Sequence, residues 1–378
     1  MTYELVGEIA NVDHTNEYRF LGPRRTCLEW EIPRHFKAKF EFTDGLTRHW
    51  AALRDQVAAC LAHSLELPPL TSPALAALKR YQHLDFTVVH SLPSYTHPDL
   101  LGFPTVLTVH DLQHLHLPEF FSSEDIATRE HHYRESCAAA DRIICVSEFT
   151  RQDVHRRYGI PLDRLETIWN LPAQASSLAL SKTRCARLLA RMGIRRPFVF
   201  YPAHAWLHKN HQRLLNAFSA ARASLPPGCM LVLTGRPPDA SHPASALLAE
   251  MTAQGAVHHL GFRTPLEISA LYQTAEALVF PSLFEGFGMP LVEAMMSGCP
   301  IASADNSSLP EIAGEAAYLF DARSEGAISE AITRITTDVA LRDRLRRIGR
   351  DRVAKLDRQA TARQTIEIYR QVHEAHFS

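Results

Sequence analysis

The sequence predicts an α/β protein of two domains, each a parallel sheet covered by helices. From about residue 85 onward, short apolar segments alternate with longer helical ones, a pattern typical of parallel sheets with helices on their faces. A Pro/Ala/Ser-rich stretch at residues 171–177 divides this alternation into two runs. The 378 residues also exceed one ordinary core, since a domain averages about 150 residues.

In the first run, the apolar segments at residues 87–90, 105–110 and 142–147 are expected to be buried strands. Residues 123–140 are expected to form a helix that begins with Ser, Asp and Glu. Ser147 is placed to cap the next helix. That helix should end at Gly159, because glycine favours helix ends and Pro161 follows.

The second run should supply six strands and the main ligand site. The strands are expected at residues 198–201, 230–234, 256–260, 277–281, 300–303 and 316–320. We predict domains at residues 1–180 and 190–355, and a C-terminal helix at 356–378 that crosses back to the N-terminal domain. Ligands bind beyond the carboxyl ends of such strands, so the cleft between the domains is the expected site.

Composition narrows the function classes. The formal net charge of −1 argues against a nucleic-acid partner. We expect no transmembrane segment, since no apolar run approaches about 20 residues, and the acidic N-terminus does not resemble a signal peptide. The seven scattered cysteines favour reduced thiols and the cytoplasm, and peripheral contact with the inner face of the membrane stays open. The Arg-rich segment 341–358 is expected to be a solvated helix face.

The most informative stretch is residues 281–303, PSLFEGFGMPLVEAMMSGCPIAS. A strand should end at its start, followed by a loop that contains Gly286 and Gly288. A helix should begin near Met289, with Pro290 in its first turn and Gly298 at its end. Small residues let a ligand approach the backbone, and a helix N-terminus favours a phosphate.

Glu285 and Glu293 lie eight residues apart on either side of this expected phosphate site. Two carboxylates there would repel a phosphate unless they bind something else. Hydroxyl groups of two sugars fit, one from the transferred sugar and one from a ribose. The pattern alone leaves open that both are ordinary surface glutamates.

The run Glu-Gly-Phe-Gly-Met-Pro-Leu-Val-Glu at 285–293, with Val-Phe-Pro-Ser before it and Gly-Cys-Pro after it, resembles the signature of the retaining GT-B glycosyltransferases of family 4. The segments 260–262 and 307–311 also fit, and the resemblance covers about residues 105–320. Around His110 and Lys209 the sequence looks most like bacterial polysaccharide mannosyltransferases. The resemblance implies two Rossmann-like domains facing across a cleft, transfer from a nucleoside-diphosphate sugar, and no metal or other cofactor.

The resemblance also implies a role for individual residues. Glu285 would contact the donor sugar and Glu293 the ribose, while His110 would contact the transferred sugar. The amides of Gly286, Phe287 and Gly288 and the ammonium group of Lys209 would bind the diphosphate. The remaining donor-side residues that we assign are Met289, His204, His208 and Phe262.

Three features bear on these roles. Ala203 stands where the family usually has an arginine, so His204 or His208 is hypothesised to supply the second positive charge. The first 50 residues contain only Gly7, Gly22 and Gly45 and lack the family's glycine-rich loop. The sequence has no Asp-x-Asp triplet, and we do not expect zinc at the loosely spaced histidines 114, 116, 131 and 132.

We therefore expect a retaining, metal-independent hexosyltransferase of polysaccharide biosynthesis. Its partners would be a nucleotide sugar, with GDP-mannose as first choice, and a glycan or lipid-linked glycan acceptor. Two alternatives remain: a GT-B protein that binds the nucleotide sugar but has lost transfer, and a GT-B nucleotide-sugar epimerase.

Overall fold

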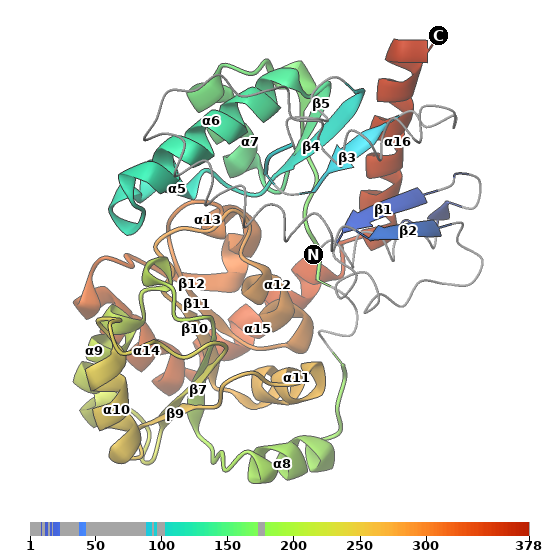
Figure 1. Ribbon diagram of the computed structural model, residues 1–378. Coiled ribbons are helices and arrows are strands. Elements are labelled where there is room, and N and C mark those ends of the chain that lie inside the picture. Colours follow the sequence, from blue (N-terminus) through green and yellow to red (C-terminus); the bar gives the residue numbers. More distant parts are fainter. Residues whose placement is uncertain are drawn as a thin grey trace. The chain divides into compact units, whose positions relative to one another are not determined.

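The structure is a computed structural model (Figure 1). It describes Ile9, Val12, Asp13 and Asn16 together with residues 18–22, 38–42, 88–92, 94–96, 103–172 and 178–377. The chain forms two compact units: one comprises residues 1–108, 132–144 and 357–378, the other residues 109–131 and 145–356. The domain limits given above follow chain order rather than contacts, so they stay a prediction. Most of the linker at 171–177, and Gly7 and Gly45, lie outside the described residues.

A six-stranded sheet forms the core of the second unit. Its order is β12-β11-β10-β7-β8-β9, and every neighbouring pair is parallel. All six predicted strands are confirmed to within two residues at each end. They are β7 Phe198–Pro202, β8 Met230–Thr234, β9 Val257–His259, β10 Ala277–Phe280, β11 Ile301–Ala304 and β12 Ala317–Phe320.

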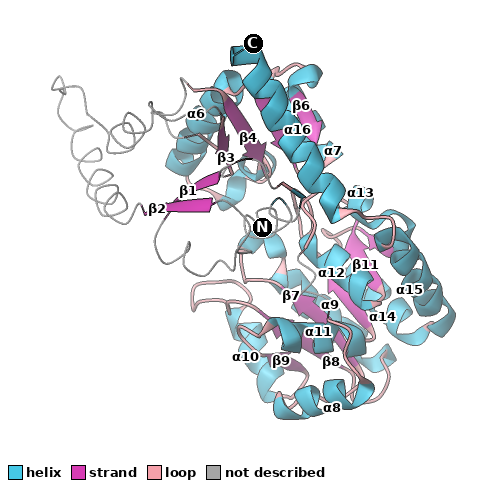
Figure 2. Cartoon of the chain, turned by 90° about the vertical axis from the view of Figure 1, so that its right-hand side faces the viewer, coloured by secondary structure: helices cyan, strands magenta, loops and turns pink. Residues whose placement is uncertain are grey.

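Helices cover both faces of this sheet. In Figure 1, α9, α10 and α14 lie on one side of the strands, and α8, α11, α12 and α15 lie on the other. Figure 2 shows the strands of this sheet in magenta and the helices around it in cyan, from a second direction. The helices are α8 Lys182–Arg191, α9 His211–Ala221, α10 Ser245–Ala253, α11 Pro265–Thr274, α12 Met289–Ser297, α13 Leu309–Ala313, α14 Glu325–Thr337 and α15 Val339–Val353.

Helix α12 begins and ends where the sequence predicts. Gly288 is its N-cap at φ 96° and Gly298 its C-cap at φ 68°, both left-handed conformations that glycine adopts without strain. Pro290 lies in the first turn, where its missing N–H costs nothing. Leu291 and Val292 are fully buried, so the apolar face of α12 packs into the core.

A four-stranded sheet has the order β3-β4-β5-β6. Its strands are β3 Val89–Ser91, β4 Thr105–Val109, β5 Arg142–Cys145 and β6 Leu165–Thr167, and β1 Tyr18–Gly22 pairs with β2 Ala38–Phe42 in a separate parallel pair. The helices of this part of the chain are α5 Gln113–His116, α6 Ser123–Ala139 and α7 Glu148–Tyr158. Ser147 caps α7 by accepting the N–H of Thr150, and Gly159 ends it at φ 68°, as predicted.

Helix α16, Arg358–Phe377, belongs to the same compact unit as β3 and most of β4. The hydroxyl of the half-buried Tyr369 lies 2.6 Å from Nδ1 of His90, whose Nε2 lies 2.8 Å from the Thr108 hydroxyl. His376 contacts Asp141 at 2.8 Å. Side chains of the C-terminal helix therefore hydrogen-bond to residues near the strands of this unit.

The expectation of a solvated face at residues 341–358 is only partly correct. Arg344 and Arg347 of α15 are exposed. By contrast, Arg342, Arg346 and Arg352 donate to backbone carbonyls, because carbonyl groups at helix ends lack partners within their helices. The acceptors are Ile335, Thr336, Gly298, Ile312 and Glu311.

His211, the first residue of α9, is a buried histidine in this core. Its ring lies 5.1 Å from that of Tyr201, and neither ring nitrogen has a hydrogen-bond partner among the described residues. Burial, followed by the nearby His242, His259 and Lys209, lowers its pKa from 6.5 to about 3. The folded protein therefore excludes a proton that the unfolded chain binds below pH 6.5.

This exclusion predicts an acid-labile fold. As pH falls below 6.5, His211 should reduce the free energy of unfolding by about 1.4 kcal/mol per pH unit until its folded pKa is reached. His211→Phe keeps a ring against Tyr201 and should lose about 2 kcal/mol less than the unmodified protein between pH 7 and pH 5. Urea unfolding at both pH values measures this, with the exposed His373→Phe as control. Equal losses in all three proteins would contradict the assignment.

Candidate active site

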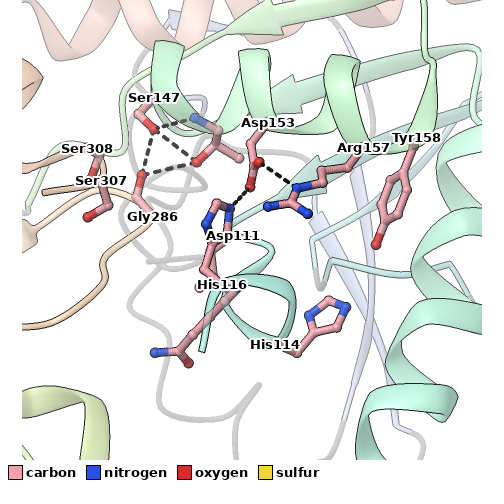
Figure 3. A network of polar contacts seen from close by, with 12 residues as sticks. Asp111, His114, His116, Ser147, Asp153, Arg157, Tyr158, Gly286, Ser307 and Ser308 are labelled. Carbon is pink, nitrogen blue, oxygen red and sulfur yellow. Dashed lines mark hydrogen bonds and ion pairs between the residues drawn. The ribbon is translucent and has the colours of Figure 1, made fainter. Parts of the chain in front are cut away.

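The loop between β10 and α12, residues 281–288, is the centre of the candidate site, and we call it the donor loop. Hydroxyl groups satisfy three of its carbonyls. Ser147 donates to Gly286 O at 2.7 Å, and Ser308 donates to Glu285 O at 2.9 Å and to Phe287 O at 3.0 Å. Figure 3 shows Ser147 and Ser308 on either side of Gly286. The carbonyl side of the loop is thus fixed by side chains.

The N–H side of the same loop is different. Glu285 N–H donates to the Ser307 hydroxyl at 3.0 Å. No described residue accepts a hydrogen bond from the N–H groups of Gly286, Phe287 or Gly288, although all three residues are buried. Buried N–H groups are rarely left without a partner, and these three precede the N-terminus of α12. They form a place where an anion would be stabilised.

Position 286 requires glycine because a side chain would not fit there, not because of its backbone angle. A Cβ at this position would lie 1.8 Å from His110 O and 3.0 Å from Asp111 Cβ. The segment after β4 therefore presses directly on the donor loop. This contact places the backbone of the predicted sugar-binding His110 beside the loop, while the contact of its ring with a sugar stays a prediction.

Lys209 and Glu285 form an ion pair. Lys209 Nζ lies 2.5 Å from Glu285 Oε1, with the two side chains 20% and 13% exposed. The backbone around the lysine is anchored, since Tyr201 donates to Lys209 O at 2.7 Å and the Asn210 side chain donates to the carbonyls of Pro281 and Ala322. The predicted phosphate-binding cation and the predicted sugar-binding carboxylate therefore lie together.

Glu293 is held by a buried tyrosine that the sequence reading did not single out. The Tyr272 hydroxyl donates to Glu293 Oε2 at 2.9 Å. Burial, followed by the charge of Glu293, raises the pKa of Tyr272 well above its usual value, so the phenol remains a donor. Tyr272 is fully buried on α11, and its hydrogen bond orients the carboxylate of Glu293.

The two histidines hypothesised to supply the second positive charge, His204 and His208, lie in different surroundings. Burial, followed by the adjacent Lys209, lowers the pKa of His208 from 6.5 to about 4, so its ring is neutral at pH 7. His204 Nδ1 accepts the N–H of Arg236 at 2.9 Å and so bears a lone pair there. Arg236 itself is exposed, and its carbonyl accepts the N–H of Ala205. Arg236 lies two residues after the end of β8, and its backbone hydrogen-bonds to the segment that contains Ala203.

Two further predicted donor-side residues are peripheral to these contacts. Phe262, just after β9, is 72% exposed, and its ring lies 5.5 Å from that of His204. Met289 is the first residue of α12 and is half-buried. Both stay predictions as ligand contacts.

Glu311 links α13 to the start of α7. The sequence indicates it only as part of the segment 307–311. Its carboxylate accepts the N–H groups of Glu148 and Phe149, each at 2.9 Å, and the indole N–H of Trp169 at 3.1 Å. A carboxylate at a helix N-terminus is stabilising. This contact fixes the beginning of α7, where Ser147 meets the donor loop.

Comparison with known proteins identifies the family. The model for glycosyl transferases group 1 matches residues 193–352, and the model for Glycosyltransferase Family 4 matches residues 38–171. The chain is a GT-B glycosyltransferase. It is 27% identical over 321 residues to O-antigen chain mannosyltransferase B of Escherichia coli, covering 85% of this chain and 82% of that protein.

Solved structures agree on the fold of this glycosyltransferase. Sucrose-phosphate synthase from Thermosynechococcus elongatus superposes with a TM-score of 0.71 at 20% identity, over 98% of this chain and 92% of that one. Anabaena HepE in complex with UDP and glucose gives 0.69 at 18% identity, over 97% and 95%. These similarities establish two parallel-sheet α/β domains, as the sequence predicts.

No group of three or more His, Cys, Asp or Glu side chains among the described residues could hold a metal ion. In the same part of the chain, no helix is both long and apolar enough to cross a membrane.

The contact of Gly286 with His110 predicts a sharp mutational effect. Gly286→Ala should displace the donor loop, because the new Cβ meets a backbone carbonyl that cannot move away easily. We expect a loss of roughly 1–3 kcal/mol in stability and loss of transfer. Gly326→Ala, where the nearest atom lies 3.8 Å away within a helix, is the matched control and should be neutral or slightly stabilising. Thermal unfolding and activity distinguish the two, and a Gly286→Ala protein as stable and active as the control would contradict the packing argument.

Proposed function

We propose that this glycosyltransferase moves mannose from GDP-mannose to a glycan or lipid-linked glycan, with retention of anomeric configuration and without a metal ion. The observation that supports this most strongly is the donor loop, in which the N–H groups of three buried residues have no acceptor among the described residues and lie on the same loop as Glu285 of the Lys–Glu pair. The relative named as an O-antigen chain mannosyltransferase supports the choice of mannose. HepE, whose structure holds UDP and glucose, supports a nucleoside-diphosphate sugar.

In this proposal the diphosphate binds the N–H groups of Gly286, Phe287 and Gly288 at the start of α12. Its negative charge draws Lys209 away from Glu285, and the freed carboxylate binds a hydroxyl of the mannose. As the bond from C1 to the diphosphate oxygen breaks, its electron pair goes to the diphosphate, and donors already in place stabilise that charge. An acceptor hydroxyl oxygen forms the new bond to C1, and its proton passes to the departing diphosphate. Arg236 adds the second cation in place of an arginine at position 203.

Glu293 completes the donor site by binding the ribose hydroxyls. Tyr272 uses its hydroxyl on one carboxylate oxygen, Oε2, so the carboxylate is held in one orientation for the ribose. The proposed division of labour is that Glu285 acts on the sugar and Glu293 on the nucleoside.

The direct test is incubation with GDP-mannose and octyl α-mannoside in excess EDTA, with the product followed by proton NMR. We expect an α-linked dimannoside at a rate that the chelator does not change. A β-linked product would overturn retention, and a strict need for Mg²⁺ or Mn²⁺ would overturn metal independence. An altered sugar nucleotide without transfer would indicate an epimerase, and binding of GDP-mannose without turnover would indicate a binding protein.

Two matched variants separate the roles of the glutamates in the same assay. Glu285→Gln should lower kcat at least 100-fold without weakening GDP binding, since GDP lacks the sugar and no longer competes with a carboxylate for Lys209. Glu293→Gln should weaken GDP binding roughly 10- to 100-fold, the usual worth of a hydrogen bond to a charged group. Equal losses of GDP affinity in the two glutamate variants would refute the division of labour.

Arg236→Ala should weaken GDP-mannose binding while the linkage stays α.

A further inference from the structure

A histidine–aspartate pair lies beside the donor loop. His116, the last residue of α5, stacks on Phe284 with ring centroids 4.7 Å apart at 30°. Phe284 immediately precedes Glu285, the residue proposed to bind the sugar. His116 therefore borders the place where the sugar would be transferred.

The hydrogen bond of His116 fixes its tautomer. Nε2 lies 2.7 Å from Oδ2 of Asp153, which is 8% exposed on α7. An ionised carboxylate only accepts, so Nε2 carries a proton, and in the neutral imidazole Nδ1 then carries the lone pair. Arg157 Nε lies 3.5 Å from the other carboxylate oxygen of Asp153. Figure 3 shows this chain from Arg157 through Asp153 to the imidazole.

The lone pair on Nδ1 is available to a ligand. No described residue hydrogen-bonds to Nδ1 of His116, and the side chain is 25% exposed. The ring cannot turn to use Nδ1 elsewhere without breaking the bond between Nε2 and Asp153. A fixed acceptor atom thus stands beside the donor loop.

His114, two residues earlier, shows what a structural histidine looks like in the same segment. It is 1% exposed, its Nε2 lies 3.0 Å from Glu130, and that carboxylate also accepts the hydroxyl of Tyr158 at 2.6 Å. Burial lowers the pKa of His114. The partial exposure of His116 is therefore not a general property of the segment.

We propose that His116 is an acceptor-binding residue, whose Nδ1 accepts a hydrogen bond from a hydroxyl group of the acceptor glycan, and that Asp153 is the positioning residue that fixes this tautomer. This assignment rests on the proposed glycosyl transfer. It gives the acceptor, a polyhydroxylated sugar, a protein contact that the donor-loop motif does not supply.

Asp153→Asn is the most informative variant. Its amide would donate to Nε2, move the ring proton to Nδ1, and convert the acceptor atom into a donor while leaving size and position nearly unchanged. His116→Gln removes the ring. The control is His155→Gln, on α7 like Asp153. The imidazole of His155 hydrogen-bonds only to Ile160 O among the described residues.

Each protein would be assayed with GDP-mannose and octyl α-mannoside, and separately for hydrolysis of GDP-mannose in water and for GDP binding by calorimetry. We expect Asp153→Asn and His116→Gln to raise the KM for octyl α-mannoside at least 10-fold. GDP affinity and donor hydrolysis should stay within about twofold of the unmodified protein, and the control should behave as the unmodified protein does.

Two results would overturn the inference alone: an unchanged KM for octyl α-mannoside in both variants, or parallel losses of GDP affinity and donor hydrolysis, which would mean that the pair merely supports Phe284. Failure of the unmodified protein either to transfer mannose or to hydrolyse GDP-mannose would instead overturn the proposed function, and the inference with it.

Discussion

The hydrogen bonds from serine hydroxyls to the carbonyls of the donor loop are the constraint on which the site depends. Ser147 and Ser308, which are far apart in the sequence, both donate hydrogen bonds to the loop. The carbonyls of residues 285–287 accept these hydrogen bonds. The N–H groups of residues 286–288 have no acceptor among the described residues, so they remain for a ligand. Glu311 stabilises this arrangement in turn, since it fixes the helix start that Ser147 caps. An anion then meets amides that need no rearrangement, which is the arrangement that favours electrostatic catalysis.

Charge within the site is balanced before any donor binds. Lys209 and Glu285 neutralise each other at 2.5 Å, which lowers the cost of burying either charge alone. A nucleoside diphosphate would compete for the lysine, and a sugar hydroxyl would compete for the carboxylate. In our account one ligand supplies both partners, so binding of a complete sugar nucleotide is favoured over binding of a phosphate or a sugar separately.

Much of the fold followed from sequence because it depends on local patterns. Strand β10 of the larger sheet, for example, is a continuous apolar run, and α12 is bounded by Gly288 and Gly298. The partner residues could not be predicted in this way. Tyr272 reads as an ordinary core aromatic, and the bond from Ser147 to Gly286 joins residues 139 apart. The arginines of α15 were read as solvated because a helical charge pattern does not reveal a carbonyl on a neighbouring helix.

The central claim is that the donor loop offers its free N–H groups to a diphosphate, and hydrogen exchange of amides 286–288 measures this directly. Exchange should be followed for the peptide that contains them, with and without saturating GDP, in the presence of EDTA. The account predicts that GDP slows the exchange of these amides, because the diphosphate oxygens become their acceptors. GDP binding that leaves their exchange unchanged would contradict it.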